Sequence, residues 1–165
     1  MKKVIVIGCP GSGKSRLSKA LSEKTGLPLY HLDMMYWKAD KTQVEKSLFL
    51  ERLSEAIENE EWLIDGNYSS TMEMRLEACD TVIFLDFPKE LCIKGIMERF
   101  GKPRSDMPWT DTELDPWLKS EIENFGIKNL PDIYSLLEKY GDGKEIVVFK
   151  SREEADNYLA RLNTK

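Results

Sequence analysis

Residues 3–15 have the sequence KVIVIGCPGSGKS, in which a short apolar run passes directly into a glycine-rich segment. Lys3–Gly8 is rich in Val and Ile, which predicts a buried β-strand. Gly8–Ser15 matches every fixed position of the phosphate-binding pattern G-x-x-x-x-G-K-[ST]. A helical pattern follows over Lys14–Thr25 and stops at Gly26. This strand–loop–helix order is the setting in which the motif binds nucleotides.

The residue types of this loop suit a triphosphate. Glycines allow the backbone to wrap until successive N–H groups point inward, and the following helix adds the positive end of its dipole. We expect Lys14 to reach the β- and γ-phosphates and the Ser15 hydroxyl to bind Mg²⁺. The predicted ATP-binding residues are Gly8, Pro10, Gly11, Ser12, Gly13, Lys14, Ser15 and Arg16.

Size and composition exclude several classes of protein. With 165 residues, of which 41% are hydrophobic and 32% charged, the chain fits one globular domain. Its net charge of −5 disfavours nucleic acid and anionic membranes as partners, and no apolar run approaches the ~20 residues of a membrane span. The three cysteines lack zinc or disulfide spacing, which favours a cytoplasmic protein. The single histidine, His31, is expected to be structural.

Four further apolar runs predict strands, and longer helical patterns separate them. The strands are expected at Pro28–Leu32, Trp62–Asp65, Thr81–Asp86 and Glu145–Phe149. Helices are expected at Thr42–Glu60, Ser70–Cys79, Pro88–Phe100, Glu113–Phe125, Asp132–Tyr140 and from Ser151 onward. Capping boxes open three of them, in Thr42-x-x-Glu45, Ser70-x-x-Glu73 and Ser151-x-x-Glu154. This alternation predicts a parallel sheet with helices on both faces, a three-layer α/β/α sandwich that forms one domain over residues 1–165.

Ligands of such sheets bind beyond the carboxyl ends of the strands, where this chain has acidic residues. The run Val82–Asp86, four apolar residues and an acid, is typical of the strand that brings a carboxylate to the magnesium side of a phosphate loop. We therefore predict that Ser15 and Asp86 bind the metal. Pro88 leaves an alternative open, in which Asp86 caps the next helix.

Two segments are candidates for the second substrate. In the first, Asp33 lies where it could act as a general base or orient magnesium-bound water, or it could cap a turn. Trp37 serves either substrate stacking or packing. In the second, Gly66 lets the backbone pass close to a ligand, and Arg75 either clamps an anionic group or is a solvated helix charge. The predicted substrate-binding residues are Asp33, Trp37, Asp65, Gly66, Asn67, Tyr68 and Arg75.

A basic cluster, unusual in this acidic chain, precedes an irregular stretch with two prolines. Its members are Lys94, Arg99, Lys102 and Arg104. We predict a lid at about 99–112 whose Arg99 and Arg104 stabilise the transferred phosphoryl group, although basic residues also complement the end of a helix. The predicted catalytic residues are Lys14, Asp33, Arg99 and Arg104.

With these motifs in place, the chain resembles the nucleoside monophosphate kinase-like branch of P-loop proteins. More closely, it resembles the bacterial DNA topology modulation proteins, which are related to adenylate kinase. The resemblance rests on GCPGSGKS, LYHLDMMYW, WLIDGNYSS and TVIFLDFP and covers nearly the whole chain. It implies a five-stranded sheet in the order 2-3-1-4-5, a substrate-binding helical insert at about 33–61, the lid at about 99–112, and adenine packing near residues 150–152.

The chain also departs from adenylate kinases, which carry an arginine shortly after the second strand. Here that stretch is Asp33-Met34-Met35-Tyr36, which disfavours AMP as the acceptor. The sequence thus predicts an adenylate kinase-like, ATP- and Mg²⁺-dependent phosphotransferase acting on a nucleotide or another small acceptor. The alternatives are a DNA topology-modulating protein and a nucleotide-binding regulatory ATPase. No motif encodes the acceptor, the choice of ATP over GTP, or the oligomeric state.

Overall fold

The computed structural model describes residues 1–162. Within that range a five-stranded sheet has the order β2-β3-β1-β4-β5, and its neighbouring strands are all parallel. The strands are β1 (Lys3–Gly8), β2 (Leu29–His31), β3 (Trp62–Asp65), β4 (Thr81–Leu85) and β5 (Glu145–Phe149). The predicted parallel α/β fold and strand order are therefore confirmed.

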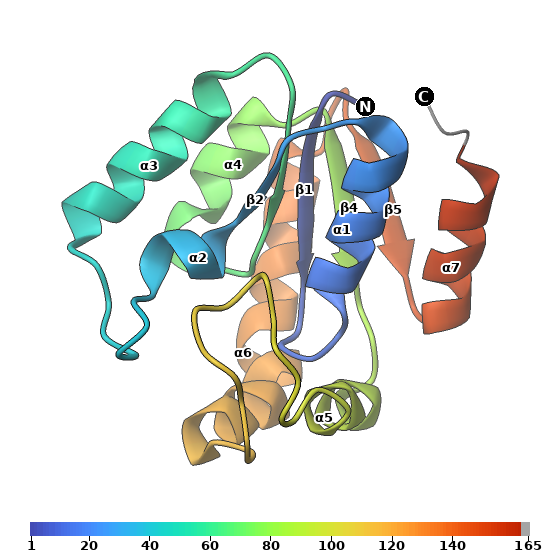
Figure 1. The fold of residues 1–165 in the computed structure, drawn as a ribbon. Coiled ribbons are helices and arrows are strands. Elements are labelled where there is room, and N and C mark those ends of the chain that lie inside the picture. The colour runs from blue at the N-terminus through green and yellow to red at the C-terminus, as the bar shows by residue number, and fades with distance from the viewer. Residues whose placement is uncertain (163–165) are drawn as a thin grey trace.

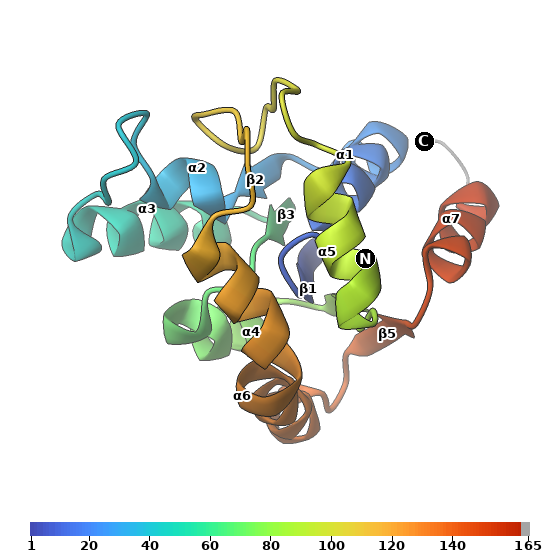
Figure 2. The ribbon, with the colours of Figure 1, turned by 90° about the horizontal axis from the view of Figure 1, so that it is seen from below.

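Helices cover both faces of this sheet, as Figures 1 and 2 show. The helices are α1 (Lys14–Thr25), α2 (Leu32–Tyr36), α3 (Lys46–Glu58), α4 (Met72–Ala78), α5 (Lys89–Met97), α6 (Pro116–Tyr140) and α7 (Arg152–Arg161), with a 3-10 turn η1 (Ser69–Thr71) before α4. Helices α1 and α7 lie on one face, and α4 and α6 lie on the other. Helix α5 lies beyond the carboxyl ends of the strands, beside the turn that follows β1.

The central strands are buried because helices cover them from both sides. Val4, Ile5, Val6 and Ile7 of β1 are 0% exposed, and β3 and β4 are buried throughout. Burial of such branched apolar side chains stabilises the fold by roughly 1.5–3 kcal/mol for each residue. This packing fixes the strand ends rigidly, and those ends carry the candidate site.

Two of the three predicted capping boxes are wrong. Thr42 does not start a helix; its N–H and hydroxyl both donate to Asp40, and α3 begins only at Lys46. The Ser70 box is replaced by η1, and α4 begins at Met72 without a side-chain cap. The third box is confirmed, since the Ser151 hydroxyl accepts from the N–H of Glu154 at 3.2 Å. In the first case a nearby aspartate satisfies the threonine locally and removes it from the helix start.

The two helices expected at Glu113–Phe125 and Asp132–Tyr140 form one continuous helix, α6. Asp115 caps it by accepting from two backbone N–H groups. Gly126 and Pro131 lie inside the helix, and both weaken helical propensity. Buried side chains on either side of them, including Phe125 and Ile133, hold the helix against the core. Tertiary packing therefore overrides the local signals to stop.

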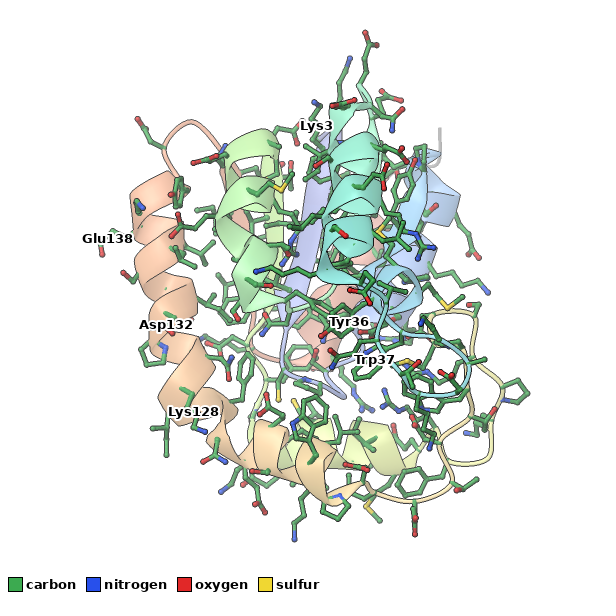
Figure 3. All side chains as sticks on the ribbon, turned by 90° about the vertical axis from the view of Figure 1, so that its left-hand side faces the viewer. Lys3, Tyr36, Trp37, Lys128, Asp132 and Glu138 are labelled. Carbon is green, nitrogen blue, oxygen red and sulfur yellow. The ribbon has the colours of Figure 1, made fainter. Side chains whose placement is uncertain are left out.

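The connection between α5 and α6 has no helix or strand over residues 99–112 and crosses the carboxyl end of the sheet toward α2 (Figure 2). We call it the 99–112 segment. Tyr36 and Trp37 lie at this same end of the molecule, away from Lys3 at the start of β1 (Figure 3). Among the helices of residues 1–162, none has the length and apolar character that a membrane span requires.

Candidate active site

The phosphate-binding loop turns at the end of β1. Gly13 precedes α1 with φ 95°, a left-handed conformation that other residues rarely adopt. Lys14 begins α1, and its Nζ donates to the carbonyl oxygens of Gly8 at 3.0 Å and Cys9 at 3.1 Å. The Ser12 Oγ is buried without a hydrogen-bond partner among the described residues. The loop therefore combines a cation with an unused hydroxyl, which suits an anionic ligand.

Helix α5 supports this loop through two glycine contacts. A Cβ added at Gly95 would lie 2.1 Å from the carbonyl oxygen of Gly11, and one added at Gly11 would lie 2.1 Å from the carbonyl oxygen of Cys92. The thiols of Cys9 and Cys92 are buried at the same contact. The hydrogen bond with Cys92, together with burial, raises the pKa of the Cys9 thiol and keeps it protonated. Helix α5 can pack this closely against the loop because glycine has no side chain at either contact position.

The 99–112 segment places Arg104 and Asp106 beside the start of α1. Arg104 donates to both carboxylate oxygens of Asp106, at 3.0 Å from Nε and 2.6 Å from Nη2. Burial alone raises the pKa of Asp106, but hydrogen bonds with Arg104 and with the Ser15 hydroxyl lower it well below its usual value. Asp106 is therefore ionised and lies next to the hydroxyl predicted to bind magnesium.

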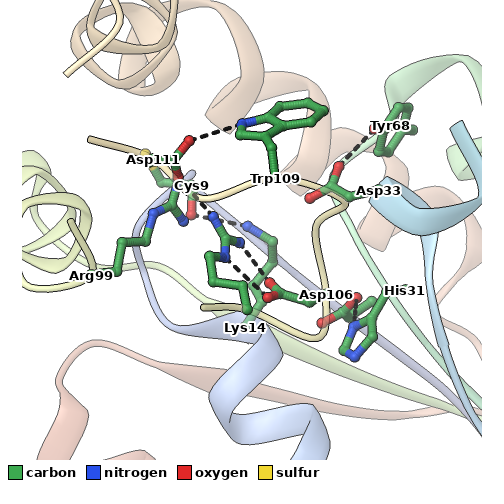
Figure 4. Close-up of polar contacts among 11 residues, drawn as sticks. Cys9, Lys14, His31, Asp33, Tyr68, Arg99, Asp106, Trp109 and Asp111 are labelled. Atoms are coloured by element: carbon green, nitrogen blue, oxygen red, sulfur yellow. Dashed lines mark hydrogen bonds and ion pairs between the residues drawn. The ribbon is translucent and has the colours of Figure 1, made fainter. Parts of the chain in front are cut away.

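Arg99 belongs to the same ionic cluster. Its Nη2 lies 3.0 Å from a carboxylate oxygen of Asp111, which also accepts from Arg104 Nη1 at 2.9 Å. Trp109 donates its indole N–H to the other oxygen of Asp111 at 3.0 Å (Figure 4). The Arg99 Nε is buried with no partner among the described residues. One guanidinium N–H is therefore left to bind an anion.

Asp33 faces this cluster from α2. Tyr68 donates its hydroxyl to Asp33 Oδ1 at 2.6 Å, and the other carboxylate oxygen lies on the side of Lys14 (Figure 4). Burial raises the pKa of Asp33 above its ordinary 3.8, against the opposing effects of Tyr68 and Lys14. A desolvated carboxylate with a raised pKa is a stronger base than one in water.

His31 and Asp65, from the adjacent strands β2 and β3, form a pair in which Asp65 is buried and His31 is half-buried. His31 Nδ1 lies 2.8 Å from Asp65 Oδ1, while Asp65 Oδ2 is buried without a partner in residues 1–162. Burial lowers the pKa of His31, but the hydrogen bond with Asp65 and the charges of Asp65 and Asp106 raise it above 6.5 overall. The imidazole is therefore held by a carboxylate at the floor of the site.

Arg75 belongs to the scaffold beneath the substrate segments. Its side chain is 0% exposed and donates to the carbonyl oxygens of Gly66 at 2.9 Å, Tyr68 at 2.9 Å and Thr71 at 3.3 Å. Burial lowers its pKa to about 10. Of the two interpretations left open by the sequence, a solvated helix charge is wrong, and in this structure the guanidinium binds backbone rather than facing an acceptor.

Gly66 and Asn67 follow β3 directly. Gly66 has φ 134°, and a Cβ added there would lie 2.8 Å from Leu32 Cβ, so the turn requires glycine. Asn67 lines a small cavity of about 30 Å³ together with residues of α6, such as Asn129 and Ile133. It thus lies toward α6, whereas Tyr68 lies toward Asp33.

Asp86 and Arg16 pair with side chains that do not belong to the phosphate loop. Asp86 accepts hydrogen bonds from the Tyr134 hydroxyl at 2.6 Å and from the Nζ of Lys150. Lys150 is the residue that follows β5. It does not cap α5, which has no side-chain cap at its start. Arg16 donates to Asp156 of α7 at 2.6 Å. The structure therefore pairs the side chains of both residues within the scaffold, and their binding roles stay predictions.

The oxygen ligands near the loop fit a magnesium ion. Mg²⁺ usually keeps several waters and takes one or two protein oxygens together with phosphate oxygens. The Ser15 hydroxyl and the Asp106 carboxylate supply two such oxygens side by side. Within residues 1–162 no cluster of three or more His, Cys, Asp or Glu side chains forms a metal cage.

Sequence reasoning missed several members of the site. Asp106 and Asp111 were not singled out, although they follow Arg99 and Arg104 in the same short loop, where opposite charges so close in sequence indicate ion pairing. The partner of His31 was also missed. The signal available was that His31 and Asp65 both end strands, and neighbouring parallel strands bring such residues together.

Comparisons with known proteins place the fold in a defined class. No known protein family and no curated protein matches the sequence. Among solved structures, the chain is similar to an unliganded sugar kinase from Janibacter sp. HTCC2649, with 18% identity and a TM-score of 0.53 over 98% of this chain and 91% of that one. It is also similar to shikimate kinase from Bacteroides thetaiotaomicron, with 18% identity and a TM-score of 0.57 over 96% of this chain and 94% of that one. The fold is therefore that of the P-loop kinases.

Proposed function

We propose that this protein is an ATP- and Mg²⁺-dependent phosphotransferase that transfers the γ-phosphoryl group to a hydroxyl of a small acceptor. One observation carries the proposal: the phosphate loop with Lys14 lies opposite the half-buried carboxylate Asp33, and the arginines of the 99–112 segment lie beside both. Phosphoryl transfer depends mainly on positioning and on neutralising charge, and these groups supply both.

Each group has a part in the step. Lys14, Arg99 and Arg104 bind the oxygens of the transferred group, and the unused Arg99 Nε adds a donor for the charge that develops. Asp33 accepts the proton of the acceptor hydroxyl as the new O–P bond forms. The bond between the γ-phosphorus and the β–γ bridging oxygen breaks, and ADP leaves with that electron pair. Tyr68 holds Asp33 in place through its hydrogen bond.

Magnesium, when bound, neutralises charge on the β- and γ-phosphates. Ser15, with Asp106 beside it, would hold the ion in this proposal. The 99–112 segment is the proposed lid, because it carries the two arginines and spans the sheet end above the phosphate loop. Closure of such a segment excludes water from the reacting groups.

The alternatives from the sequence have less support. The acidic charge and the single basic cluster, whose Arg99 and Arg104 pair with aspartates, offer little to a nucleic-acid backbone. A regulatory ATPase would need Lys14 and the arginines, but it would have no use for Asp33 as a base opposite the phosphate loop. The resemblance to DNA topology modulation proteins and the cytoplasmic location stay predictions.

The test is ATP consumption with Mg²⁺, measured as ADP release across a panel of small hydroxyl compounds and nucleotides. Lys14→Ala is the inactivating variant, and Lys19→Ala is its control, because Lys19 is an exposed lysine on the same helix. We expect one acceptor class to raise ADP release, and Lys14→Ala to remove this stimulation while Lys19→Ala keeps it. Lys14-dependent ADP release that no acceptor stimulates would instead indicate a regulatory ATPase.

A further inference from the structure

Among residues 1–162, the acceptor side of the site has no buried guanidinium left free for an anion. We use "acceptor side" for Asp33, Tyr36, Trp37, Asp65 and Tyr68, which follow β2 and β3 opposite the phosphate loop. Arg75 is the basic residue that follows β3 most closely in the sequence. Each of its three guanidinium nitrogens donates to a backbone carbonyl oxygen. Its contacts leave it no free face toward a ligand, since it is 0% exposed.

Two other cations near this side lie at the exposed surface. Arg52 of α3 donates to the carbonyl oxygen of Met35 at 3.0 Å. Lys41 lies with its Nζ 5.7 Å from the centre of the Trp109 ring and is exposed to solvent. Both side chains are exposed, so water would screen an ion pair between either of them and an anionic acceptor group, and such a pair would contribute little.

Two carboxylates face the acceptor side, Asp33 and Asp65, and His31 pairs with the second of them. Asp33 is half-buried and carries its second carboxylate oxygen toward the centre of the site. Asp65 has a second buried oxygen without a partner in residues 1–162. Lys14, Arg99 and Arg104 belong to the phosphate loop and the 99–112 segment, where the triphosphate requires them. An anionic group on the acceptor would therefore lie beside the Asp33 carboxylate, while the cations described nearby bind Asp65, backbone or the triphosphate, or are exposed to solvent.

Aromatic rings complete the acceptor side. Tyr36 contacts Trp37 and Tyr68 edge to face, each at a ring-centre distance of 5.0 Å. Trp37 contacts Trp109 of the 99–112 segment at 5.7 Å, so the two indoles meet across the site. Aromatic faces bind the C–H faces of rings and apolar surfaces, with a few polar groups setting the orientation.

We propose that the acceptor is a hydroxyl compound without an anionic group, such as a free sugar, a polyol or a nucleoside, and that phosphorylated or carboxylated analogues are rejected. This inference rests on the proposed phosphotransferase function and names its substrate class. Asp33 accepts a hydrogen bond from the reacting hydroxyl, and Trp37 and Trp109 pack against the rest of the acceptor. The ionised Asp33 rejects an anion placed beside it.

The test uses matched pairs of acceptors that differ by one anionic group: ribose and ribose 5-phosphate, glycerol and glycerol 3-phosphate, glucose and gluconate, adenosine and AMP. ADP release is measured with ATP and Mg²⁺, and the transferred phosphoryl group is identified by ³¹P NMR. We expect the neutral member of at least one pair to be phosphorylated with a kcat/KM at least ~10-fold above that of its anionic partner. Preference for an anionic member overturns this inference but leaves the phosphotransferase function standing.

A binding measurement separates the electrostatic cause from shape. With a non-hydrolysable ATP analogue bound, quenching of tryptophan fluorescence reports each acceptor through Trp37 and Trp109. For the pair with turnover, Asp33→Asn is expected to tighten binding of the anionic member several-fold and to leave the neutral member within about twofold, while turnover is lost. Asp142→Asn, an exposed carboxylate in the turn before β5, is the control and should change neither. Equal effects of Asp33→Asn on both members contradict the inference, and no transfer to any acceptor contradicts the proposed function together with it.

Discussion

The guanidinium of Arg104 binds both carboxylate oxygens of Asp106, and Asp106 in turn lies beside the hydroxyl of Ser15. This pair fills the position between the 99–112 segment and the start of α1, where a triphosphate has to bind in the proposed function. Arg99 also pairs with an aspartate of this segment, Asp111, through one contact of 3.0 Å. Before nucleotide binds, the arginines of the 99–112 segment are thus neutralised by aspartates of the same segment.

We predict that Asp106→Asn strengthens binding of ATP in the absence of magnesium by roughly tenfold, because it frees Arg104 and removes a like charge next to the phosphates. Isothermal titration with ATP and EDTA measures the change in Kd. Asp142→Asn serves again as the control for loss of one negative charge. Unchanged or weaker ATP binding by Asp106→Asn would show that Asp106 does not compete with the phosphates.

We predict that Asp33→Asn removes phosphoryl transfer, by about 10²–10⁴-fold, and at the same time stabilises the fold at pH 7. Burial raises the pKa of Asp33, so the folded protein binds this proton more tightly than the unfolded chain does. The ionised carboxylate therefore costs stability once the pH rises above its ordinary value of 3.8, and asparagine avoids that cost while still accepting from Tyr68.

Thermal unfolding at pH 7 and at pH 3 measures this effect. The difference in Tm between Asp33→Asn and the unaltered protein should be positive at pH 7 and should shrink at pH 3, where the aspartate is protonated in both states. The rate of transfer in the unaltered protein should rise with pH through the raised pKa of Asp33. A variant that is less stable at pH 7 would argue that the carboxylate is not desolvated.

Local signals were sufficient for the phosphate loop but not for the groups that surround it. The glycines and Lys14 lie within eight residues, and a strand and a helix flank them, so sequence spacing alone fixes their geometry. The opposite case is Arg75, whose three partners are backbone carbonyl groups of residues 66–71. Every residue has a backbone carbonyl group, so the sequence does not indicate which of them accept hydrogen bonds from Arg75. The role of Arg75 could therefore be recognised only from the folded structure.

The helices show the same limit. Thr42 and Glu45 have the spacing of a capping box, but the N–H and hydroxyl of Thr42 both donate to Asp40. The sequence does not show whether Thr42 bonds to Asp40 or caps a helix. Pro131 signals an end to a helix, but buried contacts made by α6 along its whole length keep it continuous. The parallel sheet was predictable because every strand depends on its own apolar run rather than on a choice between partners.

We predict that Arg75→Met destabilises the protein by about 2–5 kcal/mol, because it leaves buried carbonyl oxygens without donors. Urea unfolding at pH 7 measures the loss. Arg52→Met is the matched control, since Arg52 is exposed and donates to one carbonyl oxygen, and it should cost less than about 1 kcal/mol. Equal losses in the two variants would contradict the structural role of Arg75.

We predict that Gly95→Ala weakens ATP binding at least ~10-fold and destabilises the fold by about 1–3 kcal/mol. The added Cβ would lie 2.1 Å from the Gly11 carbonyl oxygen, and because both positions are backbone, α5 or the phosphate loop has to move. A displaced loop no longer aims its N–H groups at the phosphates. Titration with ATP and urea unfolding measure the two effects.

Gly126→Ala provides the matched control, because Gly126 also lies inside a helix and a Cβ added there would meet nothing within 4 Å. Alanine has the higher helix propensity, so this variant should be more stable by up to ~1 kcal/mol, with ATP binding unchanged. Opposite signs of the stability change in two helical glycine-to-alanine variants would tie the effect at Gly95 to its contact with Gly11. If Gly95→Ala also stabilised the protein and bound ATP normally, α5 would not be packed against the loop as the structure has it.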